Sequence, residues 1–395
     1  MNEGTATSPQ GTGITLANWR VAPWNCYAFH HVAELLPVAR IAHDPARVSA
    51  WSQAPRNLGD VAFTASDGAA WTVARLLPHT STDGFLVLHK GRLAFEWYGN
   101  GLTSTDPHIV FSVSKSITGI LAGILAERGQ LDPEAPVTRY IPEAAGSVYG
   151  DCTVRHVLDM NVGISFVENY LDTTGDFARY RAATGWNPVA DPALAGDLHG
   201  FLVTLGRDEN AHGAKFHYVS PNSDLLGWIL ERAGGAPYAR LLSDLIWRKL
   251  GTEADAHVTV DRLGAARAAG GICVTLRDLA RFGEMVRNFG RAGGEQIVPR
   301  WWIEDILNNG DRRAWLAQPT AAKFLPNGRY RSQWYMIGNA SGAYCAIGIH
   351  GQWIYIDPAA EMVIAKLSSQ PLPLEDATDH LLLAAFGAIA QSLRA

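Results

Sequence analysis

Strand-like segments lie towards both ends of this sequence, and helix-like segments fill its middle. From Phe85 the text FLVLH-KG-RLAFEWY has two apolar, aromatic runs around Lys90-Gly91, which predicts a β-hairpin. Near the other end, further short strands are predicted at Tyr344–His350, Trp353–Ile356 and Met362–Leu367. This order favours an α+β fold, in which both chain ends build one antiparallel sheet flanked by helices and a mostly helical region is inserted between them.

The predicted helices have apolar residues at helical spacing and lie between Gly, Pro or Asn signals. They cover Ser112–Glu127, Thr153–Met160, Ser223–Ala233, Tyr238–Leu250, Thr275–Phe289 and Asp376–Leu393. We interpret the whole chain, 1–395, as one unit. Residues 1–111 and 265–395 are expected to form an α/β region, and residues 112–264 a helical region.

Composition and charge exclude several classes of protein. Apolar residues make up 47% of the 395 residues, which is typical of a globular chain, and charged residues only 18%, below the usual ~25%, which favours a large core. The formal net charge is −5, and acidic and basic residues are mixed along the sequence. Because there is no basic stripe to neutralise phosphates, we do not expect a nucleic-acid partner.

The sequence predicts a cytoplasmic protein. The longest apolar runs, Ile117–Ala126 and Leu381–Ala390, are about half the ~20 residues that a membrane span needs. The first residues, MNEGTATSPQGTG, lack the basic and apolar regions of a signal peptide. The four cysteines are far apart and form no C-x-x-C motif, which indicates reduced thiols: Cys26, Cys152, Cys273 and Cys345.

The sharpest local feature is Phe111-Ser112-Val113-Ser114-Lys115-Ser116, at the start of the first long predicted helix. Ser112 and Lys115 are three residues apart, so on a helix their side chains share one face and can meet. A serine needs a base to become a nucleophile, and a lysine shielded from water can act as that base. The alternative is a simple helix cap, since S-x-x-K is a common string. The apolar surroundings of Lys115 favour a functional role, because an unpaired ammonium is costly there.

Two further segments could contribute to a site. Tyr218-Val219-Ser220-Pro221-Asn222 precedes an amphipathic helix, and such a turn can bring a phenol and an amide to the edge of a cleft. In isolation it is more typical of ordinary helix entry. Ala346-Ile347-Gly348-Ile349-His350 is typical of an apolar strand in which the glycine permits close backbone approach. In isolation it indicates a packed strand followed by a turn.

Together the three segments resemble the signature of the serine β-lactamase and penicillin-binding superfamily, which is S-x-x-K, then S-D-N or Y-x-N, then K-T-G. The tyrosine in the second segment resembles the class C branch and its carboxylesterases. Within that branch the chain is most similar to nylon-oligomer (6-aminohexanoate-dimer) hydrolases. The sequence similarity extends from about Phe85 to Ser369 and includes the segments Pro136–Tyr149, Val157–Met160 and Gly348–Gln352. The resemblance implies a β-lactamase-like fold.

The resemblance also implies a role for each matching residue. Ser112 would be the nucleophile, Lys115 the base that holds its proton, and Tyr218 the group that passes this proton to the leaving group. Backbone N–H groups of Ser112 and Ile349 would form the oxyanion hole. A lysine and a tyrosine that share a proton beside a serine form an acid–base set without histidine. No metal and no cofactor is expected.

Two positions depart from the family pattern. Ala346-Ile347-Gly348 stands where K-T-G is expected. That lysine helps the family to bind the carboxylate of β-lactams and of D-Ala peptides, so its absence argues against both substrates. Arg181, counted without gaps from Tyr170, stands where efficient nylon hydrolases have an acidic residue. An arginine there would repel a substrate ammonium, unless it points into solvent or pairs with Asp172 or Asp176.

The expected function is that of a serine hydrolase acting on small carboxylic esters or amides, with 6-aminohexanoate oligomers among the candidates. The alternative within enzymes is a β-lactamase or a DD-peptidase. The alternative from another class is a non-catalytic sensor, against which the intact serine, lysine and tyrosine argue. The sequence leaves a homodimer open. The residues expected to bind substrate are Tyr170, Arg181, Trp186, Asn222, Tyr335 and His350.

Overall fold

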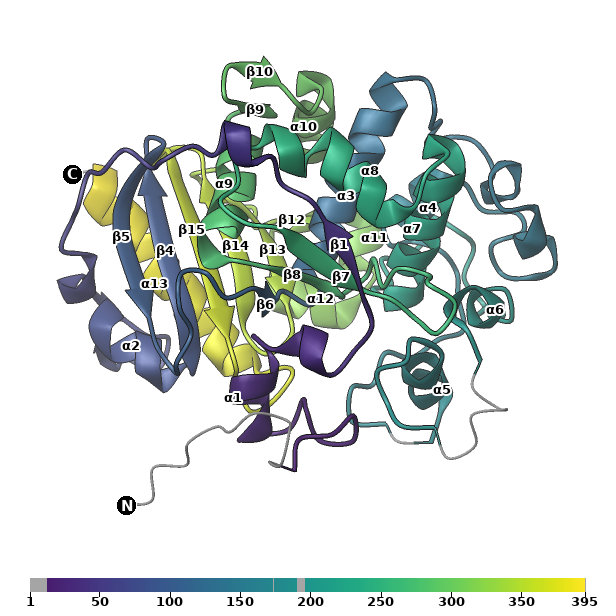
Figure 1. The fold of residues 1–395 in the computed structure, drawn as a ribbon, viewed down its shortest axis with the longest axis horizontal. Helices are drawn as coiled ribbons and strands as arrows, with labels where there is room; N and C mark the ends of the chain where they lie inside the picture. The colour runs from purple at the N-terminus through teal and green to yellow at the C-terminus, as the bar shows by residue number, and fades with distance from the viewer. Residues whose placement is uncertain (1–12, 173, 190–195, 395) are drawn as a thin grey trace.

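The main sheet combines strands from both ends of the chain, as the sequence predicts (Figure 1). The computed structural model describes residues 13–172, 174–189 and 196–394. Within them, the sheet has seven antiparallel strands in the order β11-β12-β13-β14-β15-β4-β5. The bounds are β4 Thr82–His89, β5 Arg92–Tyr98, β11 Arg329–Arg331, β12 Trp334–Met336, β13 Tyr344–Gly348, β14 Gln352–Asp357 and β15 Met362–Ser368. The mixed α+β class and the antiparallel sheet are confirmed.

Helices are the main regular elements in the middle of the chain. Those between the nucleophile motif and residue 250 are α3 Val113–Glu127, α4 Val154–Leu158, α5 Asp176–Ala183, α6 Leu198–Leu202, α7 Ser220–Gly234 and α8 Tyr238–Leu245. The later helices are α9 Leu276–Arg287, α10 Arg300–Asn308, α11 Arg312–Leu316, α12 Pro319–Phe324 and α13 Asp376–Arg394. Two short helices precede the sheet, α1 Trp24–Ala28 and α2 Val73–His79. Each predicted helix is present with different ends, and the one predicted over Tyr238–Leu250 stops at Leu245 and is followed by a short 3-10 turn, Trp247–Lys249.

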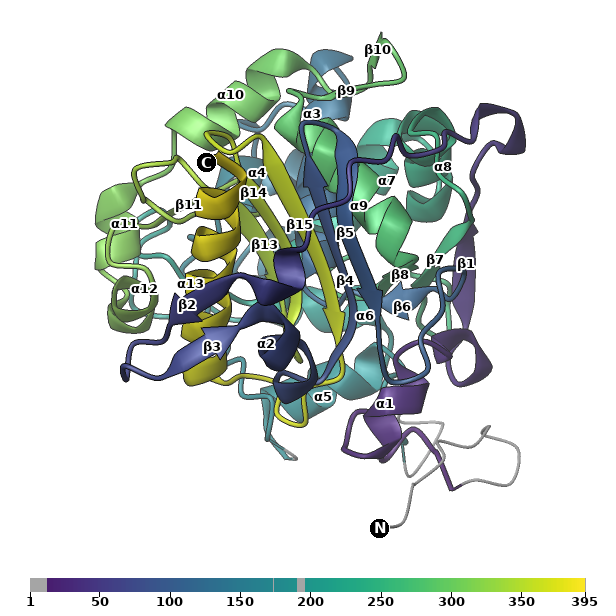
Figure 2. The same cartoon turned by 90° about the vertical axis from the view of Figure 1, so that its left-hand side faces the viewer.

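The sheet lies between two helical layers. Because side chains alternate along a strand, Phe85 and Val87 of β4 pack on one face and Leu86 and Leu88 on the other. Helix α13 covers the first face, together with α2 (Figure 2). Helix α9 packs on the second face, towards α3 and the other central helices. The order of secondary structure in the chain therefore becomes a three-layer arrangement in space.

A second, four-stranded sheet was not predicted. Its strands run in the order β1-β7-β8-β6 and are only two to four residues long, too short to show a period in the sequence. They are β1 Val38–Ile41, β6 His108–Ile109, β7 Ala256–Thr259 and β8 Ile272–Val274. Strand β7 lies inside the region expected to be helical, 112–264. Strand β6 ends three residues before Ser112, and β8 begins three residues after Ala269.

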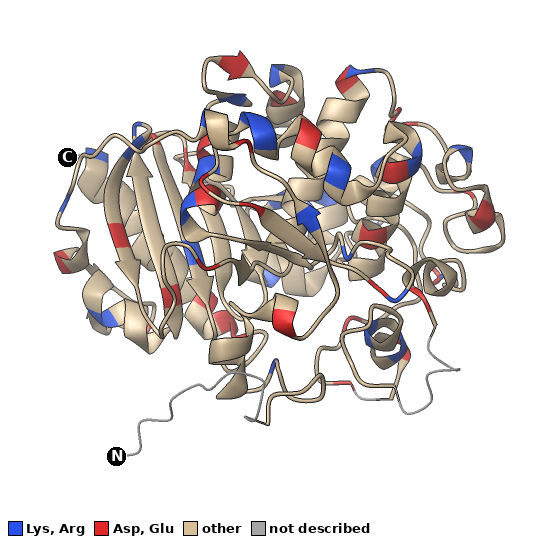
Figure 3. Cartoon of the chain, in the orientation of Figure 1, with Lys and Arg blue, Asp and Glu red and all other residues tan. Residues whose placement is uncertain are grey.

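Charges of both signs are interspersed over the ribbon (Figure 3). The cysteines at 26, 152, 273 and 345 are free thiols, and three of them are buried. Within the described ranges, no helix has the length and apolar character needed to cross a membrane. Nor do the described residues contain a group of three or more His, Cys, Asp or Glu that could hold a metal ion.

Candidate active site

Ser112 lies at the junction between the small sheet and α3. Phe111, just before it, has φ of +40°, an uncommon conformation for a residue with a side chain. This sharp turn ends the extended segment after β6 and starts the helix. Ser112 occupies the N-cap position, but its side chain forms no capping hydrogen bond. The simple-cap alternative therefore does not describe this serine, whose hydroxyl is available to other partners.

Lys115 contacts Ser112 one turn along the same helix. Its Nζ lies 2.8 Å from Ser112 Oγ, 3.0 Å from Ser220 Oγ and 2.8 Å from the carbonyl oxygen of Ala269. The side chain is 1% exposed. In the ammonium form all three N–H groups have an acceptor, and after losing a proton the amine can accept one from Ser112.

Burial sets the proton affinity of this lysine. Desolvation lowers the pKa of Lys115 from 10.5 to about 7, because the buried ammonium is deprived of water. The nearby carboxylates of Glu168 and Asp224 raise the pKa, and Arg267 lowers it. A base with a pKa near the working pH is efficient in proton transfer. The site therefore holds a lysine that can exchange a proton with Ser112 near neutral pH.

Tyr218 lies beside this pair. Lys115 Nζ is 4.9 Å from the centre of its ring. Burial and the charge of Glu168 raise the pKa of Tyr218 above its usual 10, and hydrogen bonding with Ser112 and Tyr335 offsets part of the rise. The phenol is therefore neutral at physiological pH and can donate a proton.

The two backbone N–H groups expected to form an oxyanion hole belong to residues that line the same cavities, Ser112 and Ile349. In the part of the chain that the structure describes, neither Ser112 nor Ile349 donates its N–H to an acceptor. Ile349 follows the last residue of β13, Gly348, whose missing side chain permits a close approach. A Cβ there would lie 2.5 Å from the carbonyl oxygen of Val110. The glycine in the third motif thus lets the end of β13 approach the segment just before Ser112.

Two polar residues of this cluster were not predicted. Ser220, the first residue of α7, accepts a hydrogen bond from Lys115 and donates one to Glu168, with 2.7 Å between Ser220 Oγ and Glu168 Oε1. Glu168 also accepts the N–H of Ser220 and the hydroxyl of Tyr170. Ser220 stands two residues after Tyr218, inside a segment that the sequence analysis had already selected, but no role was assigned to it. Glu168 belongs to an irregular segment with no motif around it.

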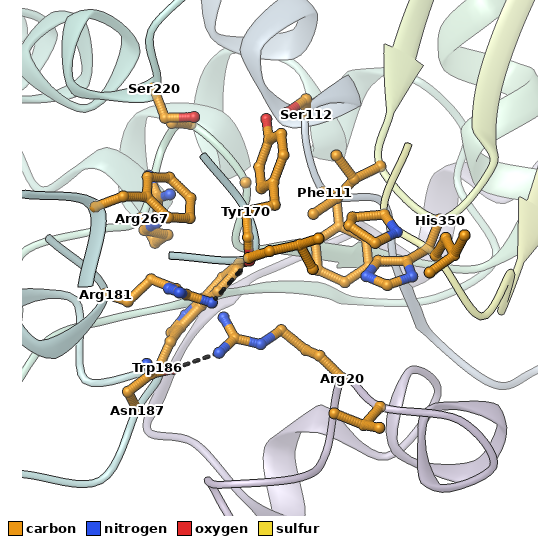
Figure 4. Close-up of a pocket in the computed structure, with 18 of the residues that line it drawn as sticks. Arg20, Phe111, Ser112, Tyr170, Arg181, Trp186, Asn187, Ser220, Arg267 and His350 are labelled. Atoms are coloured by element: carbon orange, nitrogen blue, oxygen red, sulfur yellow. Dashed lines mark hydrogen bonds between the residues drawn. The ribbon is translucent and has the colours of Figure 1, made fainter. Parts of the chain in front are cut away.

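Two cavities meet at Ser112. The first has a volume of about 530 Å³, and the second about 610 Å³. Four residues line both: Ser112, Tyr170, Ile349 and Pro373. Trp186, Arg181 and His350 line only the first cavity (Figure 4), and Tyr218 and Tyr335 only the second.

Within the first cavity, Arg181 donates to the backbone carbonyls of Tyr170 and Asp172. The Asp172 carboxylate instead accepts backbone N–H groups of its own turn, and Asp176 pairs with Arg179 at 2.8 Å. Arg181 therefore lines the cavity and forms no direct ion pair with a described carboxylate, although the charge of Asp172 acts on it.

Three further positions from the sequence analysis are buried: two residues expected to bind substrate and the alanine that stands in place of the family lysine. His350 is 3% exposed, and burial lowers its pKa to about 4, so it is a neutral wall residue. Asn222 is fully buried, accepts from Tyr149 and donates to Met160, and does not line either cavity. Its amide is used inside the helical core rather than at the substrate. Ala346, on β13, is also fully buried and lines neither cavity.

Comparison with known proteins identifies the family. The family model described as Beta-lactamase matches residues 73–388. The chain belongs to the β-lactamase family. It is 39% identical over 360 residues to the 6-aminohexanoate-dimer hydrolase of Paenarthrobacter ureafaciens, covering 91% of this chain and 89% of that one.

Solved structures agree with this assignment. A putative 6-aminohexanoate-dimer hydrolase from Bacillus anthracis is similar with a TM-score of 0.89 and 29% identity, covering 98% of this chain and 99% of that one. A family VIII carboxylesterase shares the fold, with a TM-score of 0.57 and 15% identity over 77% of this chain and 92% of its own. The protein is thus a serine hydrolase of the β-lactamase fold, as the sequence predicted.

Proposed function

We propose that this β-lactamase-family protein hydrolyses small carboxylic esters and amides through an acyl-enzyme on Ser112. The observation that carries the proposal is the 2.8 Å contact between Lys115 Nζ and Ser112 Oγ in a buried setting. A pKa of about 7 for this lysine supports its use as a base. The similarity to 6-aminohexanoate-dimer hydrolases supports amides as substrates, and the likeness to the carboxylesterase is one of fold only.

In the first half-reaction, Lys115 takes the Ser112 proton while Oγ attacks the substrate carbonyl carbon. The negative charge that develops on the carbonyl oxygen is stabilised by the N–H groups of Ser112 and Ile349. The carbon–oxygen or carbon–nitrogen bond then breaks, and the leaving group takes a proton from Tyr218. Tyr218 recovers its proton from the Lys115 ammonium, so the acid–base pair returns to its starting state.

In the second half-reaction, water replaces the leaving group. It loses a proton to the same acid–base pair, attacks the acyl carbon and releases the free acid, and Ser112 regains its hydrogen. The carboxylate of Glu168 holds Ser220 and Tyr170 around this centre through the hydrogen bonds described above. We assign Glu168 as a positioning residue that also raises the pKa of Lys115.

We also propose that the enzyme acts on small molecules in the cytoplasm. Supporting observations are a pair of cavities of a few hundred Å³ each, which suit small molecules, and the free thiols of the chain, which suit a reducing compartment. The homodimer stays a prediction.

The proposal is tested with p-nitrophenyl esters and the matching anilides. We expect wild-type protein to release p-nitrophenol, and rapid acid quenching followed by intact-mass spectrometry to trap a protein heavier by one acyl group. Lys115→Met keeps the apolar stem without the amine and should show neither. Turnover by Lys115→Met at the wild-type rate would contradict the proposal.

A further inference from the structure

The two cavities beside Ser112 carry opposite charge. In the first, the charged lining residues are three arginines, Arg20, Arg181 and Arg267, and no described Asp or Glu lines it. In the second, described lining residues include four carboxylates and neither Lys nor Arg: Glu168, Glu375, Asp376 and Asp379. A ligand that spans Ser112 therefore meets arginines on one side and carboxyl groups on the other; burial raises the pKa of Asp379 to about 7, so most of the negative charge comes from the other three.

Only one of the three arginines has a carboxylate partner. Arg267 is buried and forms an ion pair with Asp224, and its guanidinium also lies over the rings of Tyr180 and Trp186. Arg20 donates to the amide oxygen of Asn187. Within the described ranges neither Arg20 nor Arg181 has a carboxylate within ion-pair distance. These two guanidinium groups thus have no direct ion pair, and only Arg181 is partly offset, by the nearby charge of Asp172.

The positions of these two arginines are fixed rather than left to solvent. Arg20 follows Trp19, which is fully buried and donates its indole N–H to the carbonyl of Trp186 at 3.1 Å. Arg181 lies on α5 and has a buried Nε without a hydrogen-bond partner. Figure 4 shows the two side chains extending towards one another from opposite sides of the cavity. Such a pair presents several N–H donors to one place, as carboxylate binding requires.

Holding guanidinium groups close together costs free energy, and this cost adds to that of burial in lowering the pKa of Arg20. Burial, with Arg181 and Arg267 nearby, lowers the pKa of Arg20 to about 9. Burial also lowers the pKa of Arg181, and the charge of Asp172 offsets part of that shift. An anion between the two guanidinium groups would remove this repulsion.

The position of Tyr218 decides which part of a substrate enters this cavity. A leaving group must lie near the acid that protonates it, and Tyr218 lines only the acidic cavity. The acyl group therefore points into the arginine cavity. Besides the arginines, apolar and aromatic side chains line that cavity and suit a methylene chain: Phe111, Leu171, Phe177, Trp186 and Leu372.

We propose that the arginine cavity binds a carboxylate at the far end of the acyl group, so that the preferred substrates are monoesters and monoamides of linear dicarboxylic acids. This inference rests on the proposed acyl transfer to Ser112. The ester or amide bond next to Ser112 breaks, the alcohol or amine leaves with a proton from Tyr218, and water releases the free dicarboxylate. The acidic second cavity disfavours an anionic leaving group and accommodates a neutral or cationic one.

The test compares three p-nitrophenyl esters with six-carbon acyl chains: the adipate monoester, hexanoate and 6-aminohexanoate. We expect kcat/KM to be at least about tenfold higher for the adipate monoester than for hexanoate, and lowest for 6-aminohexanoate. The adipate preference should shrink as salt is added, because screening weakens partly exposed charges. Equal values for adipate and hexanoate, with all three esters hydrolysed, would overturn this inference while leaving the proposed function intact. No hydrolysis of any of them would instead count against the proposed function.

Variants locate the effect. In Arg20→Gln/Arg181→Gln the ratio of adipate to hexanoate should fall to near one, whereas Arg313→Gln, at a 97% exposed side chain, should keep the wild-type ratio. A preference that survives in the double variant would overturn the assignment to this cavity. If melting curves show that the double variant does not fold, Arg20→Gln alone is measured, and an unchanged ratio there contradicts the proposal equally.

Discussion

The catalytic cluster and the cavity walls of this protein are built in different ways. Ser112 and Lys115 are one turn apart on α3, and Ser220 starts α7, so regular structure fixes their spacing. The first cavity is walled largely by irregular or short segments, among them residues 17–21, 170–171, 186–188 and 371–373. The proposed catalytic residues are therefore placed by their spacing within helices. The residues that select the substrate come from segments that meet only in the folded chain.

The largest effect should come from the nucleophile. Ser112→Ala should lower ester turnover by about 10⁴-fold or more, because no other group replaces the attacking oxygen. The matched control is Ser116→Ala, in the same helix, whose hydroxyl donates to the carbonyl of Gln333 at 2.6 Å. The control should keep its turnover and lower the free energy of unfolding by about 1 kcal/mol. If both variants lose activity equally, disruption of the helix explains the loss, and the role assigned to the Ser112 hydroxyl is contradicted.

The next effect concerns the oxyanion hole, where a strand end meets the nucleophile segment. Gly348→Ala places a Cβ against the Val110 carbonyl and should displace Ile349, lowering kcat by about 10²–10³-fold, as for loss of one oxyanion donor. Gly387→Ala on α13 is the control, because a Cβ there meets nothing within 4 Å. It should leave kcat unchanged and raise stability by about 0.5–1 kcal/mol. Wild-type kcat in Gly348→Ala would disprove the role given to this strand end.

A smaller effect tests the cavity wall. Arg181→Asp should raise kcat/KM for the 6-aminohexanoate dimer by about tenfold, because attraction replaces repulsion of the substrate ammonium. Each protein is measured on the dimer and on a neutral ester, and the ratio of the two values is compared. An unchanged ratio would show that Arg181 does not act on the substrate.

The smallest effect is a shift in pH dependence. Ester kcat/KM should rise with pH through about 7 as Lys115 loses its proton, and fall below that pH because the ammonium cannot act as a base. Since Glu168 raises the pKa of Lys115, Glu168→Gln should move this limb to lower pH. Glu304→Gln, at an exposed carboxylate on α10, should leave it in place. A limb that moves to higher pH, or stays fixed, in Glu168→Gln would contradict the assigned role.

The comparison also explains what the sequence could predict. The periodic spacing of apolar residues predicts the terminal sheet and the central helices. The three-residue spacing of Ser112 and Lys115 predicts their contact, because residues three apart share one face of a helix. Arg20, Glu168 and Arg267 carry no local pattern, because their partners are distant in the chain. Asn222 was expected to bind substrate, yet its amide is bonded to Tyr149 inside the helical core. Motif spacing cannot reveal which way such a side chain points.

Covalent labelling tests the central claim most directly. The wild-type protein is incubated with a fluorophosphonate probe, digested, and the modified residue is located by tandem mass spectrometry. Our account predicts one adduct, on Ser112, that is absent from Ser112→Ala and strongly slowed in Lys115→Met. An adduct on another residue, or labelling that persists in Ser112→Ala, would contradict it.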